Sequence, residues 1–302
     1  MSRPASRPSA TVSVDLDPVD LHLVGYGYRG LPPDPMTYTA ALPRLLEIFD
    51  RCGLPVTFFM VARDAPAHAD AIQGVARGGH EVASHSLTHP MALASLAREP
   101  MRRELEDSRR LLEQASGGSV MGFRAPNFDL SARVIEGLVN AGYKYDASGY
   151  PTPLIIPARL LLAWKSRDAA AVMQLRAWPY SWRREPHRIT TARRSLVEYP
   201  VSVTPGLRMP VYHTPRYLIG DRRFERILDG FVERGEPLSY VLHGVDALGM
   251  REDKVDERLS RHPGMEFPLQ KKLDLLERSL KSIAQRFAAA TFRDRLVAAP
   301  AA

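Results

Sequence analysis

Short runs of β-branched and aromatic residues alternate with stretches of helical periodicity along most of the chain. The apolar runs predict strands at 11–16, 55–61, 80–84, 120–124, 143–145, 196–203 and 239–243. Helical spacing predicts helices at 38–51, 66–77, 97–114, 131–140 and 222–234, and a last helix over 268–288. The alternation of strand and helix favours a parallel α/β fold, either a distorted (β/α) barrel or an open sheet.

Composition limits the class of protein. The chain has 302 residues, 45% of them hydrophobic and 25% charged, and one cysteine, Cys52. A chain of this kind buries a large core, which excludes a disordered tail and a disulfide-rich miniprotein. We therefore expect one domain over residues 1–302, and any metal must be held by histidine and carboxylate side chains.

Neither end of the chain nor its apolar runs suggest a membrane-spanning segment. The longest apolar stretch, 154–164, is interrupted by Pro157 and Arg159 and is shorter than the ~20 residues that cross a bilayer. Residues 1–10 lack the apolar core of a secretory signal. The sequence therefore predicts a cytoplasmic protein.

The positive charge is concentrated in one segment, 150–195, which we expect to be an insertion in the domain. It holds nine basic and two acidic residues, which accounts for the whole net charge of +7, and it holds Trp164, Trp178 and Trp182. Indole rings among basic residues suit an anionic lipid surface or a phosphorylated lipid carrier. The alternative is a solvated insertion whose aromatic side chains cap the core. Nucleic acid is a weaker choice, because no binding motif accompanies the charge.

Two histidines and two aspartates follow predicted strands. His85 and His89 are four residues apart and can face the same way if the chain turns helically after its strand. Asp15 and Asp17 end the first strand, where one carboxylate can bind a metal while the other stays free as a base. Taken alone, the histidines are more often ordinary surface or core residues. The aspartates alone could equally be a helix cap, a turn or a glycosyltransferase DxD motif.

The segment 25–30 fits the GxGxxG pattern of dinucleotide-binding proteins. That pattern requires a helix that begins at the glycines, but residues 31–35 include three prolines and cannot continue as a helix. We reject a dinucleotide site. We expect instead a flexible loop near the active site that closes over substrate and brings Tyr28 into contact with it.

Arg124 and His243 each stand at the end of a further predicted strand. Alone, Arg124 is most simply an ion-pair partner and His243 a core histidine. Together with the aspartates and the histidine pair, however, they lie where α/β barrels and open sheets gather their catalytic groups.

This ordered set resembles the polysaccharide deacetylase family, also called the NodB-homology domain or carbohydrate esterase family four. The resemblance is strong over roughly 11–150 and resumes at Leu242-His243. It rests on Asp15-x-Asp17, on the run 79–89 that ends in His85-Ser-Leu-Thr-His89, on Arg124-x-Pro126-x-Phe128 and on the segment 142–146.

The resemblance implies a distorted (β/α) barrel with about seven parallel strands that hydrolyses an N-acyl group from an amino sugar. It implies a divalent metal, with zinc the first choice and cobalt, nickel or manganese the alternatives. The implied residues are Asp17, His85 and His89 as metal ligands, Asp15 as base, His243 as acid, Arg124 as the partner of the base, and Pro126, Asn127 and Phe128 at the substrate. The backbone near Phe128 would help to hold the oxyanion. Asp246 and Glu198 are the candidates for orienting His243.

The substrate is expected to be an N-acetyl or N-formyl amino sugar. The separated aspartates and the basic, Trp-rich segment resemble the lipid-linked sugar deformylase branch, which implies a polyprenyl-phosphate carrier and peripheral contact with the inner membrane face. The alternatives are a soluble substrate with another C–N amide bond, and a non-catalytic module that binds carbohydrate or lipid.

Overall fold

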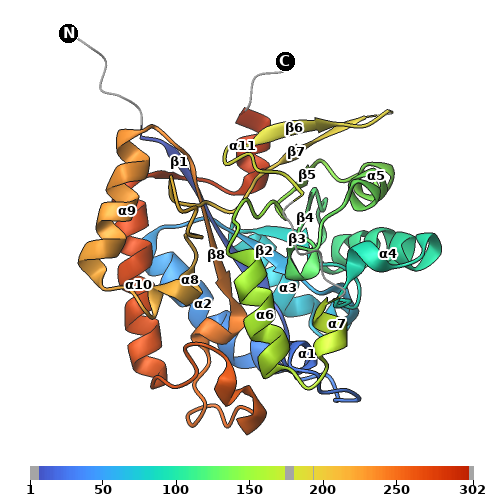
Figure 1. Cartoon of the computed structure of the whole chain (residues 1–302), viewed down its shortest axis with the longest axis horizontal. Coiled ribbons are helices and arrows are strands. Elements are labelled where there is room, and N and C mark those ends of the chain that lie inside the picture. Colours follow the sequence, from blue (N-terminus) through green and yellow to red (C-terminus); the bar gives the residue numbers. More distant parts are fainter. Residues whose placement is uncertain (1–6, 174–179, 193, 299–302) are drawn as a thin grey trace.

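The computed structural model describes residues 7–173, 180–192 and 194–298. A nine-stranded, mostly parallel sheet curls into an open, distorted (β/α) barrel with its helices on the outside (Figure 1). The strand order is β6-β7-β5-β4-β3-β2-β1-β8, and β9 also pairs with β1. Every pairing is parallel except that of β6 with β7. The barrel and the seven parallel strands expected from the sequence are therefore confirmed.

The strands are β1 (Ser9–Leu16), β2 (Val56–Met60), β3 (Glu81–Ser84), β4 (Gly122–Phe123), β5 (Tyr145–Asp146), β6 (His187–Thr190), β7 (Ser195–Glu198), β8 (Leu238–His243) and β9 (Ala288–Ala289). The α-helices are α1 (Val19–Gly25), α2 (Leu42–Cys52), α3 (Ala69–Arg77), α4 (Arg98–Ser116), α5 (Ala132–Asn140), α6 (Ile155–Lys165), α7 (Ala169–Met173), α8 (His213–Arg216), α9 (Asp221–Glu233), α10 (Leu269–Arg286) and α11 (Phe292–Ala298). Short 3₁₀ turns include η5 (Gly244–Ala247) and η6 (Glu257–Arg261).

Local chemistry explains most element boundaries. Helix α4 ends at Gly117, whose φ of 71° is the left-handed cap expected from the sequence. Strand β7 ends at Glu198 instead of continuing to residue 203, because Pro200 has no N–H to donate to a ladder. The helix expected from residue 38 begins as a π-helical turn, Thr37–Ala41, before α2 takes over.

Several elements were not anticipated from the sequence, and α6 is the most consequential. Its residues are apolar on all sides, so they give no amphipathic signal, and Pro157 reads as a helix breaker. In the structure Pro157 lies in the first turn, where its missing N–H has no helical partner in any case. Helix α1 and the strand β6, which forms a hairpin with β7, were also missed.

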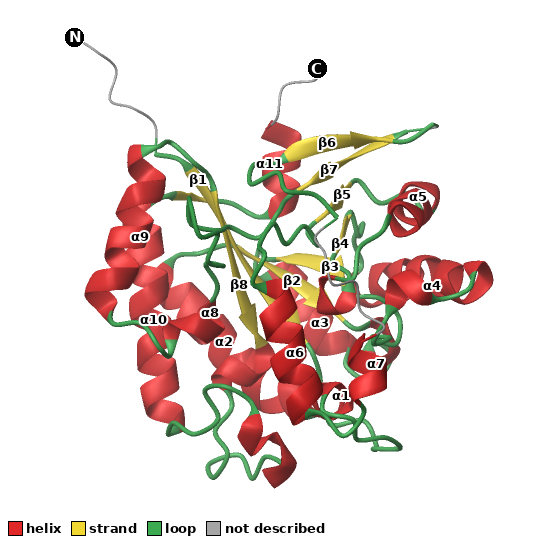
Figure 2. Ribbon diagram, in the orientation of Figure 1, coloured by secondary structure: helices red, strands yellow, loops and turns green. Residues whose placement is uncertain are grey.

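The sheet places the functional side chains by register. Asp15 of β1 lies opposite His243 of β8 on one side and Phe59 of β2 on the other, and Ser84 of β3 lies opposite Phe123 of β4. The carboxyl ends of these strands therefore meet at one edge of the barrel. Helix α6 runs in front of this region, while α9 and α10 lie together at the opposite side of the sheet from α4 and α5 (Figures 1 and 2). Among the described residues, no helix has the length and apolar character needed to cross a membrane.

Candidate active site

The histidine pair is brought together by a loop rather than by the helical turn that the sequence suggested. Ser86 and His89 have positive φ values of 67° and 57°. The Glu104 carboxylate of α4 holds the loop by accepting hydrogen bonds from the backbone N–H groups of Leu87 and Thr88 and from the Thr88 hydroxyl. The Ser86 hydroxyl accepts the N–H of His89. The expected convergence of the imidazoles is present, but its expected local cause was wrong.

Asp17, His85 and His89 form a group with the geometry of a metal site. Asp17 Oδ1 lies 3.4 Å from His85 Nε2 and 3.6 Å from His89 Nε2. Ligands held at 2.0–2.1 Å around a tetrahedral zinc are roughly 3.3–3.4 Å apart, so this spacing fits a divalent cation. Asp17 Oδ1 is also buried with no hydrogen-bond partner among the described residues.

The protonation states of the His85 and His89 imidazoles also suit metal binding. His85 Nδ1 lies 2.8 Å from the carbonyl oxygen of Arg124, so Nδ1 carries the proton and Nε2 keeps its lone pair. Burial lowers the pKa of both imidazoles, that of His89 to about 4. Both are therefore neutral near pH 7, which is the form that binds a metal.

Asp15 lies beside this group and is fixed by Arg124. The fully buried Arg124 donates from Nη1 to Asp15, from Nη2 to the Ser13 hydroxyl at 3.0 Å and from Nε to the Ala147 carbonyl at 2.9 Å. Burial raises the pKa of Asp15, but the charge of Arg124 lowers it, and the net pKa lies below the ordinary value of 3.8. The second carboxylate oxygen, Oδ2, is 3.9 Å from His243 Nε2. Asp15 is thus an ionised carboxylate between a fixed cation and an imidazole.

The structure distinguishes between Asp246 and Glu198, the two acidic residues that are candidates for orienting His243. Asp246 accepts the backbone N–H of His243 at 2.9 Å and the Tyr217 hydroxyl at 2.9 Å, so it holds the main chain at this position. Glu198 lies elsewhere: it accepts the Gly149 N–H at 2.8 Å, and the pKa of its carboxyl is raised well above the ordinary value, by burial and by the nearby Asp146. Of the two, Asp246 is the one that contacts His243.

The segment after Arg124 forms part of the cleft, and two of its residues have a strained backbone conformation. Asn127 and Phe128 have φ values of 55° and 54°, a conformation that side-chain-bearing residues rarely adopt. The Phe128 ring stacks on Tyr150 with centroids 4.8 Å apart. The N–H of Phe128 donates to the Ala125 carbonyl at 3.0 Å within this turn. Asn127 and Phe128 line the cleft, whereas the buried Pro126 shapes the turn beneath it.

Asp15, Asp17 and the imidazoles of His85, His89 and His243 open into one cleft of about 320 Å³. One wall carries the strand-end residues Asp15, Asp17, His85, His89 and His243. The opposite side is formed by α6, through Ile155, Ala158, Arg159 and Leu162, and by the rings of Tyr150 and Tyr212. The lining also contains His22, Tyr26, Arg159 and His262, which sequence reasoning did not assign to the site. Tyr26 lies within the GxGxxG segment and Arg159 within the apolar stretch 154–164, whereas the two histidines gave no local signal.

The segment 25–30 is anchored instead of forming a free loop. The Arg167 N–H donates to the Tyr26 carbonyl at 3.0 Å. Gly27 approaches the backbone of Asp168 so closely that a Cβ would lie 2.6 Å from its nitrogen, and its φ is 85°. Tyr28 lies outside the cleft lining, with the guanidinium groups of Arg167 and Arg258 within about 5 Å of its ring centroid. The loop is therefore tied to the segment that follows α6.

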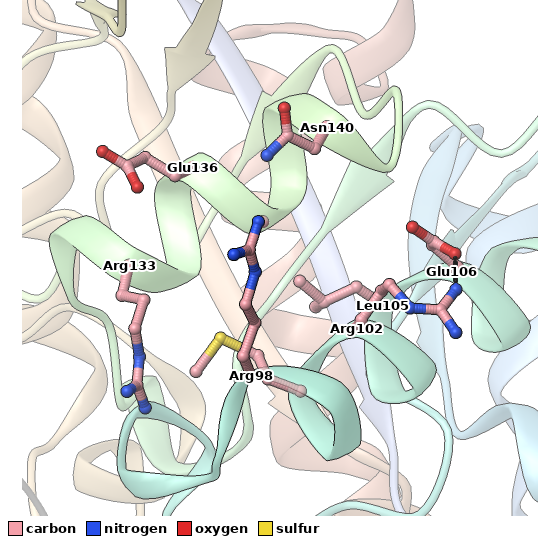
Figure 3. Close-up of a pocket in the computed structure, with 9 residues that line it drawn as sticks. Arg98, Arg102, Leu105, Glu106, Arg133, Glu136 and Asn140 are labelled. Atoms are coloured by element: carbon pink, nitrogen blue, oxygen red, sulfur yellow. Dashed lines mark hydrogen bonds and ion pairs between the residues drawn. The ribbon is translucent and has the colours of Figure 1, made fainter.

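A larger groove, of about 770 Å³, lies between α4 and α5. Its charged side chains do not converge: Arg102 pairs with Glu99 and Glu106, and Arg133 and Glu136 point in opposite directions (Figure 3). Arg133 donates to the backbone carbonyls of Ala94 and Leu96. A catalytic cleft needs groups aimed at one reacting atom, so the smaller cleft at the strand ends is the candidate active site.

Comparison with known proteins agrees with this geometry. Residues 32–145 match the family model for polysaccharide deacetylase. A peptidoglycan deacetylase of Helicobacter pylori is 30% identical over 139 residues, which are 45% of this chain and 47% of that protein. Residues 32–145 of the chain belong to the polysaccharide deacetylase family, with NodB homology.

Other members of this family show how far the similarity extends. A chitooligosaccharide deacetylase of Sinorhizobium fredii is 33% identical over 100 residues, 33% of this chain and 46% of that protein. The chain thus spans about half the length of the curated relatives it matches. A structure from Mycobacterium smegmatis described as a polysaccharide deacetylase has a TM-score of 0.63 at 19% identity, over 99% of this chain and 92% of that one. The PuuE allantoinase structure has a TM-score of 0.59 at 17% identity, over 98% and 91%. Both of these likenesses concern the fold.

Proposed function

We propose that this member of the polysaccharide deacetylase family is a metal-dependent hydrolase that removes an N-acetyl or N-formyl group from an amino sugar. The observation that carries the proposal is the pairing, in one cleft, of the Asp17–His85–His89 group with the separate carboxylate of Asp15. A metal site alone would suit a structural ion. A second, ionised carboxylate that lies next to it and is fixed by Arg124 supplies the base that hydrolysis requires.

Each residue then has a role set by its position. Asp17, His85 and His89 hold the cation, with zinc the first choice and cobalt, nickel or manganese the alternatives. The cation supplies Lewis acidity toward the acyl carbonyl and makes water easier to deprotonate. Asp15 accepts the proton of the attacking water, and Arg124 orients the Asp15 carboxylate. His243 donates a proton to the departing amine, which is a poor leaving group unless protonated.

The test is turnover by the zinc-loaded protein of a panel of N-acetyl and N-formyl amino sugars, followed by the release of free amine and of acetate or formate. We expect both products in equal amounts from at least one sugar. Release from another C–N amide such as allantoin, with none from the sugars, would favour the soluble-amide alternative. Sugar binding without turnover by protein that contains zinc would favour a non-catalytic module.

A more specific form of the proposal places the sugar on a polyprenyl phosphate at the inner face of the cytoplasmic membrane. It is supported by α6, which lines the cleft with one face and exposes Leu160, Leu161 and Trp164 on the other, the tryptophan at 81%. Lys165 and Arg167 follow these residues directly. Exposed apolar side chains beside cations suit an anionic bilayer surface.

The two other tryptophans of the segment 150–195 give less support to membrane contact. Trp182 lies under the guanidinium of Arg208, 5.2 Å from its ring centroid, and Trp178 lies outside the described residues. Co-sedimentation with vesicles of anionic phospholipid, compared with neutral vesicles, tests the membrane contact separately from turnover. Equal recovery in the supernatant with both kinds of vesicle would remove this form of the proposal and leave the hydrolase proposal in place.

A further inference from the structure

Three imidazoles form a row along one side of the cleft, beyond the metal-type group. The ring of His22, on α1, lies 6.1 Å from that of His243 and 5.1 Å from that of His262, between centroids. His262 follows η6, so the row joins α1 to two segments that lie more than 200 residues later in the sequence. All three rings line the same cleft as Asp15 and Asp17. The row therefore begins at the proposed acid and extends away from it.

Of the three histidines, only His243 lies near a carboxylate, Asp15, whereas His22 and His262 form no ion pair among the described residues. Nε2 of His22 is buried and makes no hydrogen bond among the described residues. Burial, followed by the neighbouring imidazoles His262 and His243, lowers the pKa of His22 well below the ordinary value of 6.5. Burial likewise lowers the pKa of His262 to about 4. Near pH 7 both rings are neutral, so each offers one donor and one acceptor nitrogen.

Tyr26 determines which nitrogen of His262 is left for a ligand. The Tyr26 hydroxyl lies 3.4 Å from His262 Nδ1, and burial raises the pKa of Tyr26 to about 12, so the hydroxyl keeps its proton. Either group can donate in this contact, depending on the imidazole tautomer, but in both cases Nδ1 is engaged and Nε2 remains to pair with a hydroxyl group as donor or acceptor. Tyr26 therefore fixes the ring of His262 with Nε2 as its binding atom.

Another part of the cleft lining is apolar and aromatic. It carries the stacked rings of Phe128 and Tyr150, the ring of Tyr212 and the aliphatic side chains of Ile155 and Leu162. A sugar ring has an apolar C–H face and an edge of hydroxyl groups. A cleft with an aromatic side and a side of neutral imidazoles matches both parts of such a ring.

We propose that His22 and His262 form the subsite that binds the hydroxyl-bearing edge of the amino sugar, with Tyr26 as the positioning residue of His262. The proposal rests on the proposed function for the direction of the substrate: the leaving nitrogen faces His243, so the sugar ring extends along the row. Neutral imidazoles pair with hydroxyl groups, which both donate and accept, better than with an anion that only accepts.

The test measures binding of the product-like sugar glucosamine to the zinc-loaded full-length protein by calorimetry, which requires no turnover. We expect His262→Phe to weaken binding about tenfold, the effect of losing one buried hydrogen bond. His262→Gln, which restores an N–H donor, should recover most of the loss. Tyr26→Phe should weaken binding by a smaller factor. Zinc content measured on every variant reports whether the fold and the metal-type group are intact.

The matched control is His187→Phe, which changes a histidine on β6 outside the cleft lining and should bind glucosamine as the unaltered protein does. If the protein hydrolyses an N-acyl sugar, His262→Phe should raise KM by a larger factor than it lowers kcat. Glucosamine binding that His262→Phe leaves unchanged would overturn the subsite, as would the absence of binding by unaltered protein that contains zinc. Failure of turnover with binding intact would count only against the proposed function.

Discussion

The two sides of the cleft are built in different ways. On the strand-end side, buried hydrogen bonds fix Arg124, through Ser13 and Ala147, and His85, through the carbonyl of Arg124. On the α6 side, the contribution is an apolar surface, and only Arg159 adds a cation, with Nη2 3.3 Å from the Asn127 carbonyl. The contrast indicates that the first side sets the chemistry and the second shapes what can approach it.

The largest expected effect concerns the metal-type group. Asp17→Ala or His85→Ala should abolish zinc binding and lower turnover of an N-acyl sugar at least a thousandfold, because a site with two remaining ligands no longer fixes the cation. Elemental analysis and an amine-release assay measure the two effects. His187→Ala serves as the control. Full zinc content in Asp17→Ala would show that the group does not hold the cation.

The next effect separates the base from the metal ligands. Asp15→Asn removes the negative charge but keeps the shape, so zinc content should be unchanged while kcat falls by roughly 10²–10⁴. Ser13→Ala removes only one hydrogen bond of Arg124 and should cause a much smaller loss. An Asp15→Asn variant as active as the unaltered protein would discard the base assignment.

On the α6 side the expected effect is on membrane binding. Replacing Leu160, Leu161 and Trp164 by serine should weaken binding to anionic vesicles by about 3 kcal/mol, roughly a hundredfold, at about 1 kcal/mol for each partly inserted side chain. Turnover of a water-soluble sugar tests whether the cleft is intact. The control, Leu207→Ser with Leu218→Ser, removes exposed leucines from other elements. Equal vesicle binding by the α6 variant and the control would refute a lipid-facing role for α6.

The smallest effect is a pH dependence of stability. Lys272 is buried, and its Nζ donates to the Val245 and Leu248 carbonyls behind His243. Burial lowers its pKa from 10.5 to about 8, so between these pH values the folded protein binds fewer protons than the unfolded chain. Stability should therefore rise with pH, by about 2 kcal/mol from pH 7 to 9.5 for this group alone.

Urea unfolding at several pH values measures that rise, and Lys272→Met should remove it. An identical pH slope in the unaltered protein and in Lys272→Met would contradict the assignment.

The same contrast explains what could be predicted from the sequence. The strands β1, β3 and β8 alternate with helices in a clear pattern, and their ends carry Asp15, Asp17, His85, His89 and His243 in an order that indicated one site. Parallel pairing converts that order into proximity, so the fold and these positions could be predicted. The expected helical turn at 85–89 was wrong, because the hydrogen bonds that this loop donates to Glu104 depend on a distant helix.

Other features of the structure depend on tertiary contacts that no local sequence pattern reveals. Helix α6 is mostly apolar and has a proline in its first turn, so periodicity could not reveal it or its place on the cleft. Tyr28 was expected at the substrate but is drawn away by Arg167 and Arg258, from two other segments. The row of His22 and His262 joins segments about 240 residues apart, a proximity that spacing along the chain does not encode.

The hydrogen bonds that Glu104 accepts from residues 87 and 88 also limit which evolutionary changes this fold tolerates. One carboxylate links the outer layer of the barrel to the loop that carries His89, so α4 cannot slide along its axis without displacing that histidine. Substitutions on the solvent-exposed face of α4 leave this contact intact. A change in the position of the helix requires a new hydrogen-bond acceptor for the loop at the same time.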